Sequence, residues 1–182
     1  AFLPPLPGIK IDIFYLNLNL QLNPEVNYIH GEAVIHYRAK SKGDTLAFYL
    51  HDSLFVSKVK FHNTDLMPMR PGGHVLILPL GEMLQPGKKD SIFIRYEGVS
   101  GTIAGQKGLY TASHNGKPYL WTLSEPYGSP TWWPSKLNLD DKIDSLIITM
   151  SHPAVFRSAA NGMLIKEIRT DSTATTIWKH RY

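Results

Sequence analysis

The chain of 182 residues contains no cysteine, so disulfide bonds and thiolate metal sites are excluded. The same absence leaves the redox compartment open, because a chain without cysteine tolerates either side of a membrane. No apolar run approaches the roughly 20 residues that a membrane-spanning helix requires. The first residues, which begin at Ala1, lack the charged and apolar regions of a secretory signal. We expect no transmembrane segment, and an export signal that has been removed or was never present.

Charge of one sign is not concentrated anywhere along the chain. The 19 lysines and arginines are scattered among 15 aspartates and glutamates, which gives a net charge of +4. This pattern excludes the basic stripe of a nucleic-acid-binding protein and the basic patch of a membrane-surface protein. A chain of this length with 43% hydrophobic residues buries roughly 70% of its unfolded surface. We therefore expect one soluble domain covering residues 1–182.

Helical periodicity is also missing, and strand-like alternation takes its place. Apolar residues occupy alternate positions from Asp12 to Leu22, which is typical of a half-buried strand. The apolar face predicted for this strand consists of Phe14, Leu16, Leu18, Leu20 and Leu22. A second alternating run extends from Tyr28 to Ala39, after the turn Asn23-Pro24-Glu25. We predict that the two strands pair as an antiparallel hairpin.

Many shorter runs follow, separated by turn sequences rich in glycine, proline and aspartate. We predict further strands at Leu46 to Leu50, Phe55 to Phe61, Val75 to Leu80, Ile92 to Tyr96, Leu146 to Met150, Phe156 to Ala159, Met163 to Arg169 and Thr175 to His180. The segment 98–117 is rich in glycine, serine and threonine, and we expect a loop there with a short strand near Leu109-Tyr110. Short strands at this spacing predict an all-β sandwich.

The most unusual stretch of the chain runs from Trp121 to Ser135. It contains three of the four tryptophans, three prolines and a single carboxylate, Glu125. The prolines exclude a helix interior, and Pro126 cannot donate a hydrogen bond to a sheet, so Glu125 marks the end of a strand. A carboxylate in that position can face a cleft. Trp132 and Trp133 either wall such a cleft or fill the end of the sandwich core, and we favour the core.

Six dispersed motifs occur in the order and at the spacing of one known family. They are Gly108-Leu109-Tyr110, Thr122-Leu123-Ser124-Glu125-Pro126, Trp133-Pro134-Ser135, Asp141-Lys142, Asn161-Gly162 and the last strand, which ends Trp178-Lys179-His180-Arg181-Tyr182. Through these residues the chain resembles the N-terminal β domain of the gluzincin zinc aminopeptidases, the aminopeptidase N family, in its bacterial form. The resemblance covers essentially the whole chain and implies an antiparallel, saddle-like β-sandwich.

The family's zinc site requires H-E-x-x-H on a helix, in which two histidines bind the metal and the glutamate acts as base. None of the eight histidines has a partner at that spacing, so this chain alone is not catalytic. The resemblance implies a parent enzyme that removes N-terminal residues from peptides, with zinc held in a C-terminal catalytic domain that this chain lacks. Similarity to exported bacterial members favours an extracytoplasmic location.

The resemblance also implies a role for Glu125, because related enzymes use a residue of this motif to hold the α-ammonium of the peptide substrate. Its possible neighbours at that site are Leu123, Ser124 and Tyr127. Many relatives have glutamine where this chain has Leu123, so a side-chain amide contact is missing. Many also have cysteine and acidic residues in place of the segment 135–138. The alternative is that the Glu125 carboxylate only accepts hydrogen bonds from loop amides.

Two possible metal clusters are weak in the sequence. His30 and His36 share the polar face of one predicted strand, but six residues at ~3.3 Å each place them about 20 Å apart. Asp140-Asp141 with Lys142 and Asp144 is more typical of a solvated loop than of a cation site. We therefore expect no metal bound by this domain.

Two other functions remain open. A stand-alone β-sandwich binding module for carbohydrate or protein would use Trp121, Tyr127, Trp132 and Trp133 as a stacking platform, which requires exposed, coplanar rings. A purely structural domain would contact its catalytic partner without touching the substrate.

Overall fold

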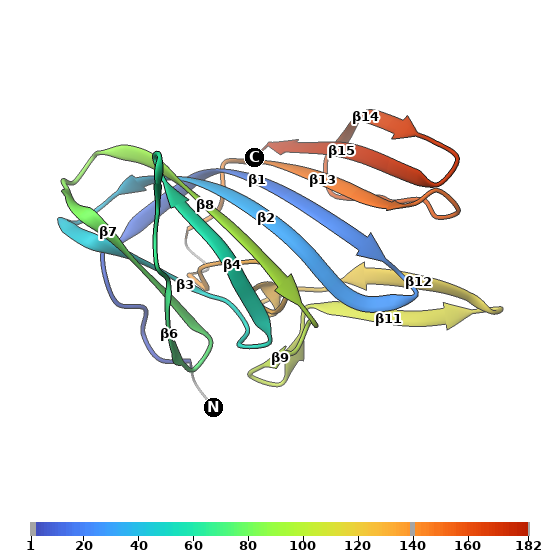
Figure 1. Cartoon of the computed structure of the whole chain (residues 1–182), viewed down its shortest axis with the longest axis horizontal. Helices are drawn as coiled ribbons and strands as arrows, with labels where there is room; N and C mark the ends of the chain where they lie inside the picture. Colours follow the sequence, from blue (N-terminus) through green and yellow to red (C-terminus); the bar gives the residue numbers. More distant parts are fainter. Residues whose placement is uncertain (1–2, 139–140, 182) are drawn as a thin grey trace.

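The computed structural model describes residues 3–138 and 141–181, and Figure 1 shows their arrangement in sheets. The larger sheet has eight strands in the order β14 (Met163–Arg169), β15 (Thr173–Arg181), β13 (Ser145–Pro153), β1 (Ile11–Asn23), β2 (Val26–Ala39), β8 (Lys89–Gly98), β4 (Leu54–Phe61) and β5 (Thr64–Asp65). The smaller sheet has the order β3 (Gly43–Tyr49), β7 (Val75–Leu84) and β6 (Met69–Gly72).

Two short ribbons and one helical turn complete the structure. The ribbons pair β9 (Thr102–Ile103) with β10 (Gln106–Lys107), and β11 (Leu109–His114) with β12 (Lys117–Thr122). A single 3₁₀ turn, η1 (Ser129–Thr131), is the only helical element in the described part of the chain. No helix in the described ranges is long and apolar enough to cross a membrane. The expected all-β architecture is confirmed.

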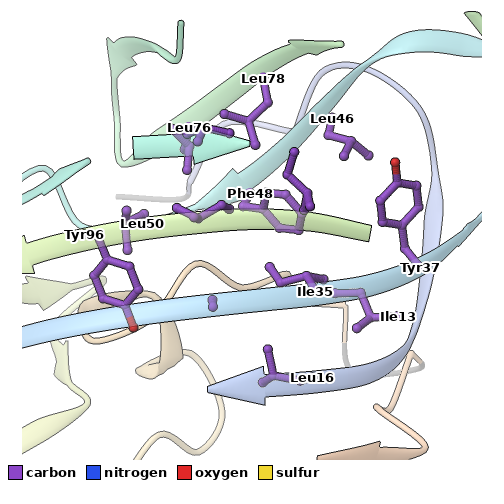
Figure 2. Close-up of a cluster of buried hydrophobic side chains, with 14 of the residues drawn as sticks. Ile13, Leu16, Ile35, Tyr37, Leu46, Phe48, Leu50, Leu76, Leu78 and Tyr96 are labelled. Carbon is purple, nitrogen blue, oxygen red and sulfur yellow. The ribbon is translucent and has the colours of Figure 1, made fainter. Parts of the chain in front are cut away.

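The core lies between the two sheets. Figure 2 shows Leu76 and Leu78 of β7 and Phe48 of β3 facing Ile35 of β2 and Leu16 of β1. These five side chains are at most 2% exposed. Because successive side chains of a strand point to opposite faces of the sheet, the apolar residues of each strand lie between the two sheets and the residues that alternate with them lie outside. The two sheets therefore form a sandwich.

The predicted hairpin of β1 and β2 is confirmed, but one predicted residue faces the wrong way. Ile13 pairs with Tyr37 and Tyr15 pairs with His36, so Phe14 is the extra residue of a β-bulge. The bulge reverses the inward and outward faces of β1 at this point. Phe14 is therefore only partly buried, and its ring lies 6.1 Å from the His36 ring.

The pairing within the sheets is antiparallel with one exception, the neighbours β1 and β13. These two strands run parallel, with Leu16 opposite Leu146 and Leu20 opposite Met150. β13 then pairs with β15, and β15 with β14, which extends the large sheet beyond the region covered by the small one (Figure 1). The two long strands β1 and β2 curve strongly, which gives the large sheet a saddle-like form.

The other strand predictions are confirmed except at 156–159, which is not a strand. There the chain turns after Pro153, and the Phe156 amide donates a hydrogen bond to the Pro153 carbonyl at 3.1 Å. His152 is buried, and its Nε2 atom lies 3.1 Å from Ser158 Oγ. Apolar content suggested a strand here, but the segment forms a turn held by these local contacts. The short strand expected near Leu109-Tyr110 is β11.

Candidate functional site

The loop that carries Glu125 begins where β12 ends, at Thr122, and returns toward the core at η1. Its backbone is closed by two hydrogen bonds, from Leu123 N to the Gly108 carbonyl at 3.0 Å and from Gly128 N to the Ser124 carbonyl at 2.8 Å. A third bond joins it to the β9–β10 ribbon, because Tyr127 N donates to Gln106 Oε1 at 2.9 Å. The Glu125-Pro126 peptide bond is cis. The loop therefore has a defined backbone path.

Trp132 anchors this loop to the core. Its indole Nε1 donates a hydrogen bond to Ser124 Oγ at 2.8 Å, and its carbonyl accepts one from the hydroxyl of Tyr96 at 2.8 Å. Tyr96 is fully buried on β8. Because the Ser124 hydroxyl is already bound to Trp132, we assign it to the support of the loop.

A close approach of two glycines fixes the loop from the other side. A Cβ atom on Gly108 would lie 2.0 Å from the carbonyl oxygen of Gly128, which only glycine avoids. The fully buried Thr131 bridges the two backbones, since its Oγ1 accepts from Gly108 N at 2.9 Å and donates to the Gly128 carbonyl at 2.8 Å. Gly108, the glycine of the first matched motif, therefore has a packing reason.

Downstream of the tryptophans the chain is joined to β3 and β1. Ser135 is fully buried, pairs through its backbone with Tyr49 at 2.8 and 2.9 Å, and contacts Ser129 Oγ at 2.8 Å. Ser135 thus occupies a small buried site beside β3. Lys136 forms an ion pair with Asp141 and donates to the Ile11 carbonyl. Asp141 is mostly buried, so the expectation of a solvated loop is wrong for this residue, and Asp140 lies outside the described residues.

Glu125 differs from the residues around it because its carboxylate makes no hydrogen bond or ion pair with any residue in the described ranges. The residue is exposed to solvent. The side chains of Leu123 and Tyr127, on either side of it, are also exposed, by 58% and 40%. No loop amide donates to this carboxylate in the described structure, unlike the alternative raised from the sequence. The arrangement can offer an anionic acceptor to a cation outside the domain.

The four tryptophan-region aromatics do not form one platform. Trp132 and Trp133 are partly buried against the core, and their rings meet edge to face at 65°. The preferred core interpretation is therefore correct for this pair. Trp121, at 39% exposure, instead stacks between Tyr110 and Tyr119 on the β11–β12 ribbon, at interplanar angles of 12° and 21°. Sequence reasoning missed these two tyrosines, although the i, i+2 spacing of Tyr119 and Trp121 was a signal for a shared face.

The predicted separation of His30 and His36 is consistent with their contacts. His30 Nδ1 lies 2.8 Å from a Glu97 carboxylate oxygen, and the His36 ring packs at 5.1 Å on Tyr15. A different group, His62 with Glu82 and Asp90, gathers possible metal ligands in the described structure. Nothing in the sequence indicated this group, because the three residues come from separate parts of the chain.

Exposed apolar side chains gather on β14, the edge strand of the large sheet, which lies away from the small sheet (Figure 1). All seven residues of β14 are exposed, although four of them are large and apolar. They are Met163, Leu164, Ile165 and Ile168. The neighbouring turn adds Val155, which is 83% exposed. In a folded chain such a cluster is typical of a surface that another domain covers.

Comparison with solved structures identifies this fold, whereas comparison with protein-family models and with curated proteins gives no match. An M1 zinc metallopeptidase from Deinococcus radiodurans superposes with a TM-score of 0.81 at 19% identity, over 94% of this chain and 39% of that chain. A variant of that enzyme bound to a Tyr-Ser-Ala substrate gives 0.80 at 18% identity over the same shares of the two chains.

A structure described as a two-domain M1 zinc metallopeptidase bound to L-tryptophan gives a TM-score of 0.81 at 18% identity, over 93% of this chain and 39% of that one. The chain thus spans about two fifths of the length of the metallopeptidases it matches. The saddle-like sandwich expected from the six motifs is confirmed. The chain has the fold of the N-terminal β-sandwich domain of M1 zinc metallopeptidases.

Proposed function

We propose that this chain is the non-catalytic N-terminal domain of a zinc aminopeptidase, that it packs on a catalytic domain, and that it contributes Glu125 to the site for the substrate α-ammonium. The single observation that carries the substrate role is the unpartnered Glu125 carboxylate on an otherwise fully anchored loop. The fold match to metallopeptidases of which this chain spans 39% supports the parent assignment.

The chemistry of Glu125 suits an ammonium ligand. A cation that leaves water for a partly closed cleft needs an anionic acceptor, and a charge-assisted hydrogen bond is about twice as strong as a neutral one. The backbone bonds from Leu123, Tyr127 and Gly128 fix the loop before the substrate arrives, so little ordering remains when it binds. An acceptor for a free α-ammonium would also explain why such an enzyme acts at peptide N-termini.

The exposed apolar cluster on β14 supports the packing role. Met163, Leu164, Ile165 and Ile168 present hydrophobic side chains, which a catalytic domain would cover. The residues of this chain do not fit the catalytic zinc itself, because no two histidines have the H-E-x-x-H spacing. We place the zinc ligands in the catalytic domain.

The test uses the full-length parent protein with Glu125→Gln. Loss of a charge-assisted bond worth about 1.5–3 kcal/mol predicts a fall of kcat/KM by roughly 10- to 150-fold on aminoacyl substrates. Glu25→Gln is the matched control, because Glu25 is an exposed glutamate in the β1–β2 turn. If both variants keep full activity, the substrate role is wrong and a purely structural domain is favoured.

One observation favours the second candidate, a binding module. The rings of Tyr110, Trp121 and Tyr119 are stacked with nearly parallel planes, and the Lys107 ammonium lies 5.8 Å from the Tyr110 ring centre. Trp121 and Tyr119 are exposed, and an outer face of the stack can pack on a sugar ring. Binding of the 182-residue chain to oligosaccharides, abolished by Trp121→Ala, would support this candidate. No binding by the chain would remove it.

A further inference from the structure

Three residues from separate segments of the chain place metal-binding atoms together at one edge of the sandwich. His62 follows β4, Glu82 lies in β7 of the small sheet, and Asp90 lies in β8 of the large sheet. One ligand atom from each residue lies within 4.8 Å of the other two. An imidazole with two carboxylates is a donor set that suits divalent transition-metal ions such as zinc.

Two of the three ligands are already oriented toward each other. His62 Nε2 lies 3.0 Å from both carboxylate oxygens of Asp90. The backbone of His62 has a φ of 54°, and its ring stacks on Phe61 at 4.0 Å between centroids. The Asp90 carboxylate also accepts a hydrogen bond from Ser91 N at 2.9 Å. The imidazole and the carboxylate are therefore held in place without the third residue.

The separations are close to those around a bound ion. Zinc binds nitrogen and oxygen at about 2.0–2.2 Å, so two ligand atoms of a tetrahedral site lie about 3.3 Å apart. The His62–Asp90 distance of 3.0 Å is near that value. Glu82 is exposed, and its carboxylate forms no ion pair within the described structure. The Glu82 carboxylate lies within 4.8 Å of the His62 and Asp90 ligand atoms, and a change of its side-chain rotamer can bring it closer to both.

A second, independent observation comes from Tyr37. Its side chain is fully buried, and its hydroxyl has no hydrogen-bond partner in the described structure. Tyr37 pairs directly with Asp90 between β2 and β8, which places both side chains on the same face of the sheet. Burial raises the Tyr37 pKa, and the negative charges of Asp90 and Glu82 raise it further. Both carboxylates therefore lie within electrostatic range of the Tyr37 hydroxyl. The buried Tyr37 hydroxyl needs an acceptor oxygen for its hydrogen bond, and this cluster can supply one.

Lys89, the single lysine of β8, forms no ion pair with these carboxylates in the described structure. The ammonium of Lys89 lies 5.4 Å from the centre of the Phe14 ring. Phe14 was displaced by the bulge in β1 and packs beside His36. The cluster thus keeps two carboxylates close to one imidazole, and a bound cation would relieve the repulsion between the carboxylates.

We propose that His62, Glu82 and Asp90 form a binding site for a divalent transition-metal ion, such as zinc, that links the two sheets. Glu82 comes from the small sheet and Asp90 from the large one, so a bound ion would cross-link the edges of the sandwich. The Tyr37 hydroxyl would donate to a carboxylate or to a water molecule of the site. The proposal is independent of the aminopeptidase assignment and uses none of its residues.

The test is zinc binding by the 182-residue chain after treatment with a chelator. We expect one equivalent of zinc at micromolar concentrations, measured by equilibrium dialysis with elemental analysis, and an increase in unfolding temperature. His62→Gln and Glu82→Gln should each lose the zinc and the thermal shift. His30→Gln is the control, because His30 pairs with Glu97 outside the cluster.

Folding of each variant is checked by its urea midpoint in the presence of chelator, so that loss of binding is not confused with loss of structure. Cobalt substitution adds a readout of the ligands, because visible absorption bands of the bound ion should disappear in His62→Gln. If the chain binds no zinc, or if both cluster variants bind zinc as the unmodified chain does, the metal site is wrong and the cluster is an ordinary ion pair.

Discussion

Two fully buried tyrosines differ in one respect, and their comparison tests the packing of the whole sandwich. Figure 2 shows Tyr37 and Tyr96 at opposite ends of the core cluster, each with its hydroxyl at the edge of the apolar side chains. The Tyr96 hydroxyl donates to the Trp132 carbonyl at 2.8 Å, whereas that of Tyr37 has no partner in the described structure. We predict that Tyr96→Phe destabilises the chain and that Tyr37→Phe stabilises it.

The magnitudes follow from what each hydroxyl does. Tyr96→Phe removes a hydrogen bond with a net value of about 1 kcal/mol and leaves the Trp132 carbonyl without its partner, for a total cost of about 1–3 kcal/mol. Tyr37→Phe removes a polar atom that was buried without compensation, which should stabilise the chain by about 1–2 kcal/mol. The two substitutions delete the same atom, so the expected difference in unfolding free energy is about 2–5 kcal/mol.

The assay is equilibrium unfolding in urea near pH 7, with chelator present so that no metal ion contributes. Burial raises the pKa of both tyrosines above the ordinary value of 10.0, so the measurement compares neutral hydroxyls. A change of midpoint without a change of slope reports stability alone. If Tyr37→Phe destabilises the chain as much as Tyr96→Phe does, the Tyr37 hydroxyl has a bonding partner and the argument from its isolation is refuted.

Two further substitutions test local packing and pH dependence. Gly31→Ala would place a Cβ atom 2.3 Å from Cζ of the buried Tyr96, so we expect a loss of about 1–3 kcal/mol or more in urea unfolding, and an unchanged midpoint would contradict this packing. Burial, with the stacked His74 at 4.6 Å, lowers the His51 pKa from 6.5. The unfolded chain therefore binds more protons below that pH, and stability should fall as pH falls from about 7 to 5. His51→Gln should flatten this dependence in thermal unfolding, and an unchanged slope would assign it to other groups.

The strands were predictable because alternation within each one records which side chains face the core. Leu16, Leu18 and Leu20 of β1 and the inward row of β2 follow this rule. The bulge at Phe14 was not predictable, because an extra residue changes the pairing partner without changing the residue types around it. The parallel pairing of β1 with β13 was equally invisible, since no turn joins the two strands and sets their register.

Part of the candidate site could likewise be predicted from the sequence, and part could not. Glu125 was proposed as a site residue from its place after a strand and before Pro126, and from a matched motif. Its lack of a partner depends on contacts that only the folded chain supplies, such as the hydrogen bond that occupies Ser124. His62, Glu82 and Asp90 were missed because they meet across two sheets, and local patterns carry no information about such a meeting.

The parallel pairing of β1 with β13 also affects how this fold can form during translation. β1 is synthesised before β13, so the edge of β1 that carries Leu16 stays unpaired until Leu146 has been made. During translation this edge exposes unpaired amide and carbonyl groups, with which strands of other chains can pair. Nascent chains of this protein should therefore depend on chaperones that shield strand edges until the last third of the domain has emerged.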